Sequence, residues 1–91
     1  MSDEYQVVWS NDALQQLASL WLAAEDRSPV NVAVTGLDEA LSRQPESKGA
    51  EVAEELRRLQ FGPLRVYFQI EDGQNRVLIV AVRAARSSGS T

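Results

Sequence analysis

The sequence predicts a single α+β domain in which a helical hairpin packs on a small antiparallel sheet. Two stretches with helical spacing of apolar residues, 14–22 and 30–41, precede a stretch of strict apolar–polar alternation at 64–71. A chain of 91 residues has room for one domain and one modest core. We therefore expect residues 1–91 to form one unit whose ordered part covers about residues 5–86.

The composition excludes several kinds of chemistry. The chain has no cysteine and no histidine, which removes disulfides, thiolate metal sites and the side chain best suited to proton transfer near neutral pH. We expect no cofactor. The start of the chain is acidic where a signal peptide would be basic, and no apolar run approaches the roughly 18 to 20 residues of a membrane span. The sequence thus predicts a cytoplasmic protein without a membrane partner.

The charge is unevenly distributed along the chain. The net charge of −4 comes from 13 acidic and 9 basic residues. The charged residues within 1–46 are mostly acidic, whereas six arginines from Arg57 onward oppose only Glu71 and Asp72. A nucleic-acid-binding domain needs a continuous basic face, and only the C-terminal third offers one.

The first expected elements are a strand and a helix. Residues 5–10 are rich in β-branched and aromatic side chains, which favours a short strand, and Ser10 or Asn11 can cap the helix that follows. This helix should end near Ala24. The apolar residues of this helix predict one buried face; they are Leu14, Leu17, Ala18, Trp21 and Leu22. We expect both Trp21 in the helix and Trp9 in the strand to pack in the core.

A second helix should follow and form an antiparallel hairpin with the first. Ser28-Pro29 is a start signal, and Gln44-Pro45 ends the pattern. Gly36 within this helix costs about 1 kcal/mol relative to alanine, so we expect close packing against it. The expected buried positions are Val30, Ala33, Val34, Leu37, Ala40 and Leu41.

The C-terminal half is expected to provide the sheet. After a loop at 46–50, residues 51–60 are rich in helix formers, and local propensity predicts a helix there. Residues 64–71 alternate as a half-buried strand. Residues 76–83 form a nearly continuous apolar strand, as expected for one that is covered on both faces or central in the sheet. Residues 87–91 should fray.

Four segments resemble the RelE/ParE toxins of bacterial type II toxin–antitoxin systems. They are residues 5–21, Leu37–Leu41 with the trailing Pro45, Pro63–Ile70 and Val77–Val82. The resemblance covers about residues 5–86 and implies the order β-α-α-β-β-β. It places a strand within 55–61, with room for a helical turn before it, so residues 51–60 are left open between helix and strand.

The resemblance also implies a function. The chain would be the toxin of a plasmid-stabilisation pair, neutralised by a cognate antitoxin that packs across the helical hairpin or adds to a sheet edge. Its target would be translation, at ribosome-bound mRNA, or DNA gyrase. The alternatives are a degenerate, non-toxic relative that serves as a protein-binding module, and a nucleic-acid-binding domain unrelated to toxins.

The arginines are the candidate site residues. RNA-cleaving members of the family use basic side chains on the concave face of the sheet and a tyrosine or histidine near the C-terminus. By resemblance Arg65, Arg83 and Arg86 are candidate catalytic residues, and Arg57, Arg58 and Tyr67 are candidate substrate- or partner-binding residues. No tyrosine or histidine follows Val82, so we expect mRNA endoribonuclease activity to be weak or lost. The simpler interpretation is that Arg65, Arg83 and Arg86 are solvated strand ends, or pair with Glu71, Asp72 or an acidic antitoxin.

Overall fold

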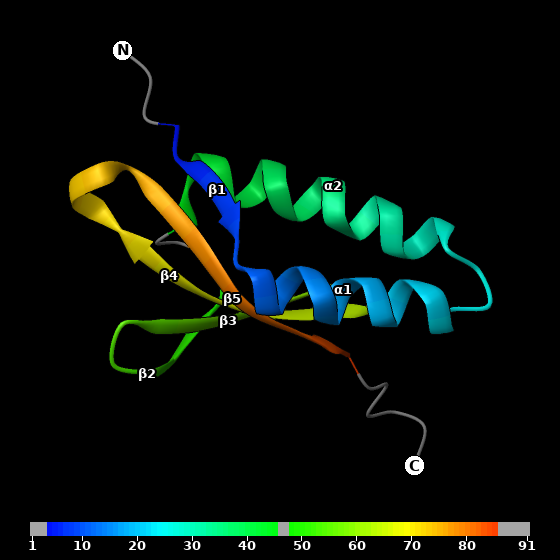
Figure 1. Cartoon of the computed structure of the whole chain (residues 1–91). Coiled ribbons are helices and arrows are strands. Elements are labelled where there is room, and N and C mark those ends of the chain that lie inside the picture. The colour runs from blue at the N-terminus through cyan, green and yellow to red at the C-terminus, as the bar shows by residue number, and fades with distance from the viewer. Residues whose placement is uncertain (1–3, 46–47, 86–91) are drawn as a thin grey trace.

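The computed structural model describes residues 4–45 and 48–85 and confirms the α+β class (Figure 1). The predicted loop falls partly, and the predicted frayed end wholly, outside these residues. The sheet has one more strand than expected. The elements in chain order are β1 Gln6–Trp9, α1 Asn11–Ala23, α2 Ser28–Arg43, β2 Ala50–Ala53, β3 Leu56–Phe61, β4 Leu64–Glu71 and β5 Arg76–Ala84.

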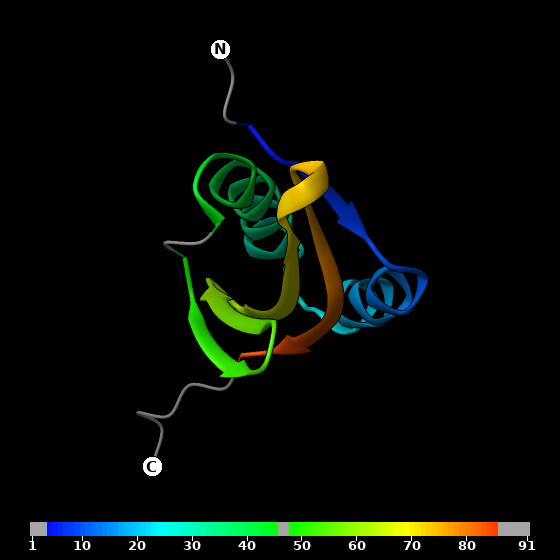
Figure 2. The ribbon, with the colours of Figure 1, turned by 90° about the vertical axis from the view of Figure 1, so that its left-hand side faces the viewer.

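The five strands lie in the order β1-β5-β4-β3-β2, and Figure 2 shows the sheet curving around α2. The expected antiparallel pairing holds from β2 to β5, whereas β1 runs parallel to β5, so the sheet is mixed. Strand β5 has neighbours on both sides, as its continuous apolar sequence predicted.

Residues 51–60 correct the prediction from local propensity. The strand expected within 55–61 is present as β3, but strand β2 stands where a helix or helical turn was expected. Strand β3 pairs with β4 along its length, from Arg57 opposite Phe68 to Phe61 opposite Leu64. This pairing outweighs a helix propensity that amounts to a few tenths of a kcal/mol per residue.

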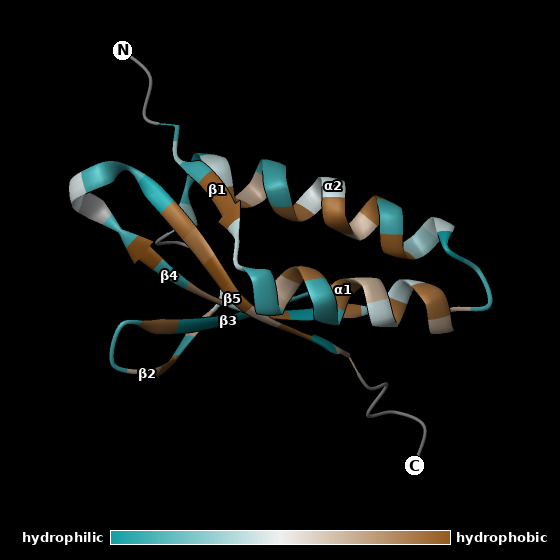
Figure 3. Ribbon diagram, in the orientation of Figure 1, coloured by the Kyte–Doolittle hydropathy of each residue, from teal (hydrophilic) through white to brown (hydrophobic). Residues whose placement is uncertain are grey.

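The core lies between α2 and the middle of the sheet. The buried side chains of α2 fall where the helical spacing predicted them, and Figure 3 shows apolar segments on β1 and β5 and apolar bands alternating with polar ones along both helices. No helix in the described ranges is long and apolar enough to cross a membrane. The buried residues are Ala13 of α1, Val30, Ala33, Leu37 and Leu41 of α2, Leu64, Val66 and Phe68 of β4, and Val77, Ile79 and Val82 of β5.

Gly36 has the close neighbour that its position in α2 predicted. A Cβ atom at this position would lie 2.4 Å from Cε1 of Phe61, at the end of β3. Real Cβ atoms essentially never approach another heavy atom so closely. The glycine therefore lets the phenyl ring of Phe61 lie against the backbone of α2, which fixes the distance between α2 and β3.

Candidate functional site

Cross-strand pairing brings four of the candidate side chains onto one face of the sheet. Arg65 of β4 lies opposite Arg83 of β5, and Tyr67 of β4 lies opposite Arg58 of β3. Directly opposed residues share a face, and residues two apart on one strand also share it. Leu64, with the other buried residues of β4, points to the opposite face. We call the face that carries Arg58, Arg65, Tyr67 and Arg83 the basic face.

The basic face has little compensating charge. In the described part of the chain the one ion pair joins Arg76 to Glu71, and none involves the three arginines of the basic face. Glu71 shares their side of β4 but lies at its far end, opposite Arg76. Like charges directly opposite each other destabilise a sheet. The pair Arg65 and Arg83 therefore costs folding free energy that a functional role would explain.

Two of the predicted site residues do not join this cluster. Arg57 lies opposite Phe68, whose side chain is buried in the core, so Arg57 projects from the other side of the sheet. Arg86 lies outside the described residues. The structure thus separates the adjacent arginines 57 and 58, because neighbouring residues of a strand point to opposite faces.

A second surface was only partly foreseen. A groove of about 590 Å³ runs between α1 and α2. Leu14 at 48% exposure and Trp21 at 36% lie at this surface, so the prediction that the whole apolar stripe of α1 is buried is wrong. Leu22, beyond the groove, is 67% exposed. The groove is lined by Leu14, Leu17, Ala18 and Trp21 of α1 and by Val30, Asn31, Val34 and Thr35 of α2.

The sequence contained a signal for this groove. Ala13, Leu17, Leu20 and Ala24 pack on the core, and they already form a complete helical stripe. The remaining apolar side chains of α1 exceed what one face can bury. Such an excess indicates a second contact surface.

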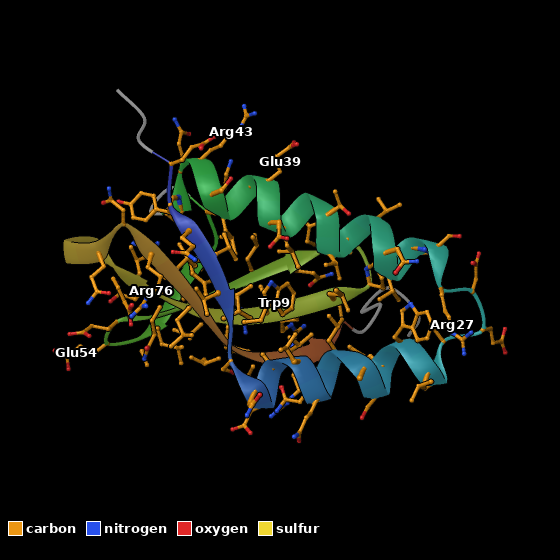
Figure 4. The ribbon with its side chains drawn as sticks, turned by 45° about the horizontal axis from the view of Figure 1, so that its top comes forward. Trp9, Arg27, Glu39, Arg43, Glu54 and Arg76 are labelled. Carbon is orange, nitrogen blue, oxygen red and sulfur yellow. The ribbon has the colours of Figure 1, made fainter. Side chains whose placement is uncertain are left out.

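Trp21 is held at the end of the groove near the α1–α2 connection. Its indole Nε1 donates a hydrogen bond to Asn31 Oδ1 at 3.2 Å, and the guanidinium of Arg27 lies 4.2 Å from the ring centroid. Arg27 Nε also donates to the carbonyl oxygen of Trp21 at 3.1 Å. Figure 4 shows Arg27 at this end of the hairpin, far from Trp9. Trp9 does pack against the core as predicted, and its Nε1 donates to Asp38 Oδ1 at 3.3 Å.

Several solved structures that share this fold come from toxin–antitoxin pairs. The RelBE2 toxin–antitoxin complex of Mycobacterium tuberculosis superposes with a TM-score of 0.77 at 21% identity, covering 92% of this chain and 94% of that one. The chromosomal ParDE system of P. aeruginosa gives 0.68 at 10% identity, covering 93% and 100%. The archaeal RelE–RelB complex of Pyrococcus horikoshii gives 0.65 at 17%, covering 92% and 99%. The chain matches no curated protein in sequence.

A curved mixed sheet with a helical hairpin beside it is the fold that this chain shares with these toxin–antitoxin structures. The sequence of residues 7–88 matches the model of a protein family that is described as the ParE toxin of the type II toxin–antitoxin system, parDE. The chain belongs to this ParE toxin family. It is the toxin component of a type II toxin–antitoxin system.

Proposed function

We propose that this toxin acts on DNA gyrase by binding through the basic face, and that it does not cleave mRNA. RNA cleavage needs one group that removes a proton from the attacking hydroxyl and another that protonates the leaving oxygen. Arginine stays protonated, so Arg58, Arg65 and Arg83 can stabilise negative charge but cannot move protons. Tyr67 is the one proton-transfer group beside them in the described residues, and one group does not supply both steps.

Binding to a target demands less of the same face. Three arginines without a carboxylate partner in the described residues offer charge-assisted hydrogen bonds to acidic or phosphate groups of a target. Both candidate targets, gyrase and the translating ribosome, are cytoplasmic, and we place the protein there. The observation that carries the proposal is the opposition of Arg65 and Arg83 with no carboxylate paired to either.

Two reactions with the purified protein test the target. In a gyrase supercoiling reaction we expect inhibition that rises with toxin concentration and is lost in Arg65→Ala. In a translation reaction with primer-extension mapping we expect no new cleavage in the ribosomal A site. A-site cleavage without gyrase inhibition would assign the mRNA as the target instead. Neither activity, together with normal growth of cells that express the chain alone, would indicate a non-toxic protein-binding relative.

We further propose that the α1–α2 groove receives an apolar helix of a cognate antitoxin. Several of the structural neighbours are toxin–antitoxin complexes of RelBE or RelE–RelB type. The groove is largely apolar and open, and an amphipathic helix would insert apolar residues at i, i+3 or i+4, and i+7. Arg27 at its end favours a carboxylate on the partner.

The groove is tested by calorimetry with a cognate antitoxin, which is to be sought as the product of a short reading frame next to the gene. We expect Ala18→Arg, which fills the groove, to abolish binding. Ser19→Arg adds the same charge one position away, outside the groove lining, and should bind normally. Equal binding by both variants would exclude the groove and direct attention to the sheet edges.

A further inference from the structure

Strand β5 is longer than the strand that pairs with its outer edge. The last paired residue of β1 is Trp9, opposite Ile79, and the Ser10 amide still donates to the carbonyl oxygen of Ile79 at 2.9 Å. Strand β5 continues to Ala84. Within the described residues, its outer edge from Val80 onward therefore has no strand beside it.

Helix α1 occupies this position with side chains in place of a strand. The Ser10 hydroxyl donates to the carbonyl oxygen of Val80 at 3.4 Å, and Gln16 Oε1 accepts a hydrogen bond from the Val82 amide at 2.7 Å. The side chain of Val82 is buried, so its amide has poor access to water as a substitute partner. Gln16 thus accepts a hydrogen bond from the Val82 amide, which a residue of a further neighbouring strand would otherwise accept.

This anchor lies next to a weak point of β5. The register between β4 and β5 shifts at Tyr67/Phe68, which leaves Val80 as the extra residue of a bulge. A bulge bends and twists its strand and interrupts the ladder. The segment after it is held by pairing to β4 on one side and by the Gln16 contact on the other.

Arg83 follows this anchored amide directly. Its guanidinium donates to the carbonyl oxygen of Val82 at 3.3 Å, and its side chain lies opposite Arg65 on the basic face. We propose that Gln16 is a positioning residue for Arg83: its amide oxygen fixes the Val82 peptide and thereby the direction of the Arg83 side chain. This inference rests on the proposed function only where activity is measured.

Three variants separate this role from general stability. Gln16→Met keeps the length of the side chain and removes the acceptor, whereas Gln16→Glu keeps an acceptor. Gln15→Met is the matched control on the exposed neighbouring position. By NMR hydrogen exchange we expect the Val82 amide to exchange about tenfold faster in Gln16→Met and to stay near wild type in the other two, because one hydrogen bond is lost.

The activity measurement uses a double-mutant cycle with Arg83. In the gyrase reaction we expect Gln16→Met to weaken inhibition about as much as Arg83→Ala does. Gln16→Glu should inhibit nearly as well as the wild type. In the Arg83→Ala background, Gln16→Met should have no further effect. Additive losses, or equal losses in the Met and Glu variants, would overturn the inference.

If the wild-type protein does not inhibit gyrase, the proposed function is refuted, and the role of Gln16 is then tested by hydrogen exchange alone. In that case unchanged Val82 exchange in Gln16→Met would overturn the inference, and selective acceleration at Val82 and Arg83 would support it.

Discussion

The basic face shows at the level of single residues how position decides what an arginine can do. Arg65 is half-buried in β4, with a strand on each side, so its side chain has one direction. Arg83 is exposed near the end of β5. Side chains held by rigid elements bind with a smaller loss of conformational freedom than mobile ones.

We therefore predict that Arg65→Ala weakens binding to gyrase by about 2 kcal/mol or more, roughly 30-fold, and more than Arg83→Ala does. Titration of gyrase inhibition with each variant measures the difference. Arg43→Ala, an exposed arginine at the end of α2, is the control and should bind like the wild type. A larger loss in Arg83→Ala than in Arg65→Ala would contradict this order.

A second prediction concerns the contribution of Leu37, in the core, to the free energy of unfolding. Leu37 is 0% exposed, and Leu37→Ala removes buried methyl groups and leaves a cavity, which should lower the free energy of unfolding by about 2 to 5 kcal/mol. Denaturant titration measures this loss. Val32→Ala on the same helix is the control, because Val32 is 68% exposed and the change should stay within about 0.5 kcal/mol. A loss below about 0.5 kcal/mol for Leu37→Ala would mean that this stripe is not core.

At the scale of elements, the contact between α2 and β3 reverses the usual effect of a helical glycine. Alanine would gain about 1 kcal/mol of helix propensity at Gly36, but the Phe61 ring occupies the space of its Cβ atom. We expect Gly36→Ala to destabilise the fold by about 1 to 3 kcal/mol in thermal or denaturant unfolding.

Combining the two sites tests the cause of that loss. In a Phe61→Leu background the outer ring atoms are absent, so Gly36→Ala should become neutral or stabilising. An equal loss in both backgrounds would show that the ring is not the reason for the glycine.

In the turn between β2 and β3 we expect the opposite effect, a substitution by glycine that raises the free energy of unfolding. Glu55 has a φ of 62°, a left-handed conformation that costs a residue with a side chain about 1 to 2 kcal/mol. Part of this is returned by the greater freedom of glycine in the unfolded chain, so Glu55→Gly should raise the unfolding free energy by about 0.5 to 1 kcal/mol. Asn75→Gly at φ 49° should gain less, because asparagine tolerates this region. A lower free energy of unfolding in Glu55→Gly would show that the backbone of Glu55 is not strained.

The elements differ in how well the sequence alone specified them. Helix α2 and strand β4 were predicted almost to the residue, because their apolar periods match surfaces that are in fact buried. Strand β2 was missed, since Ala50–Ala53 is exposed throughout and its four residues carry no burial pattern. Its conformation depends on pairing with β3, which is information held elsewhere in the chain.

The site was predictable in composition and not in geometry. Arginine at 58, 65 and 83 is visible in the sequence, but their convergence depends on the register of three strands. The register also places Arg57 on the opposite side, although it is adjacent to Arg58. Gln16 carried no signal, because its partner is a backbone amide 66 positions away.

At the scale of the whole molecule, the two candidate surfaces lie on different parts of the fold. The basic face belongs to β3, β4 and β5, whereas the groove belongs to α1 and α2. An antitoxin helix in the groove therefore need not cover the arginines with the same segment. The charge distribution agrees with this division, since the acidic residues concentrate in the first half of the chain and the arginines in the second.

We predict that the two functions separate by mutation. Cells expressing Ala18→Arg should remain growth-arrested when the antitoxin is co-expressed, because the toxin is active but not captured. Cells expressing Arg65→Ala should grow, and the purified variant should still bind the antitoxin with wild-type affinity. Loss of antitoxin binding in Arg65→Ala would show that the two surfaces overlap.

The contact between Ser10 and Val80 joins positions 70 residues apart, where the first strand, at one edge of the sheet, lies beside the last. A ribosome adds about 5 to 20 residues per second, so β1 waits several seconds for its partner to be synthesised. Pairing of strands so far apart in the sequence is also slow. Because Arg83 of the basic face also lies in β5, that face assembles only after β5 has been made, several seconds after the two helices.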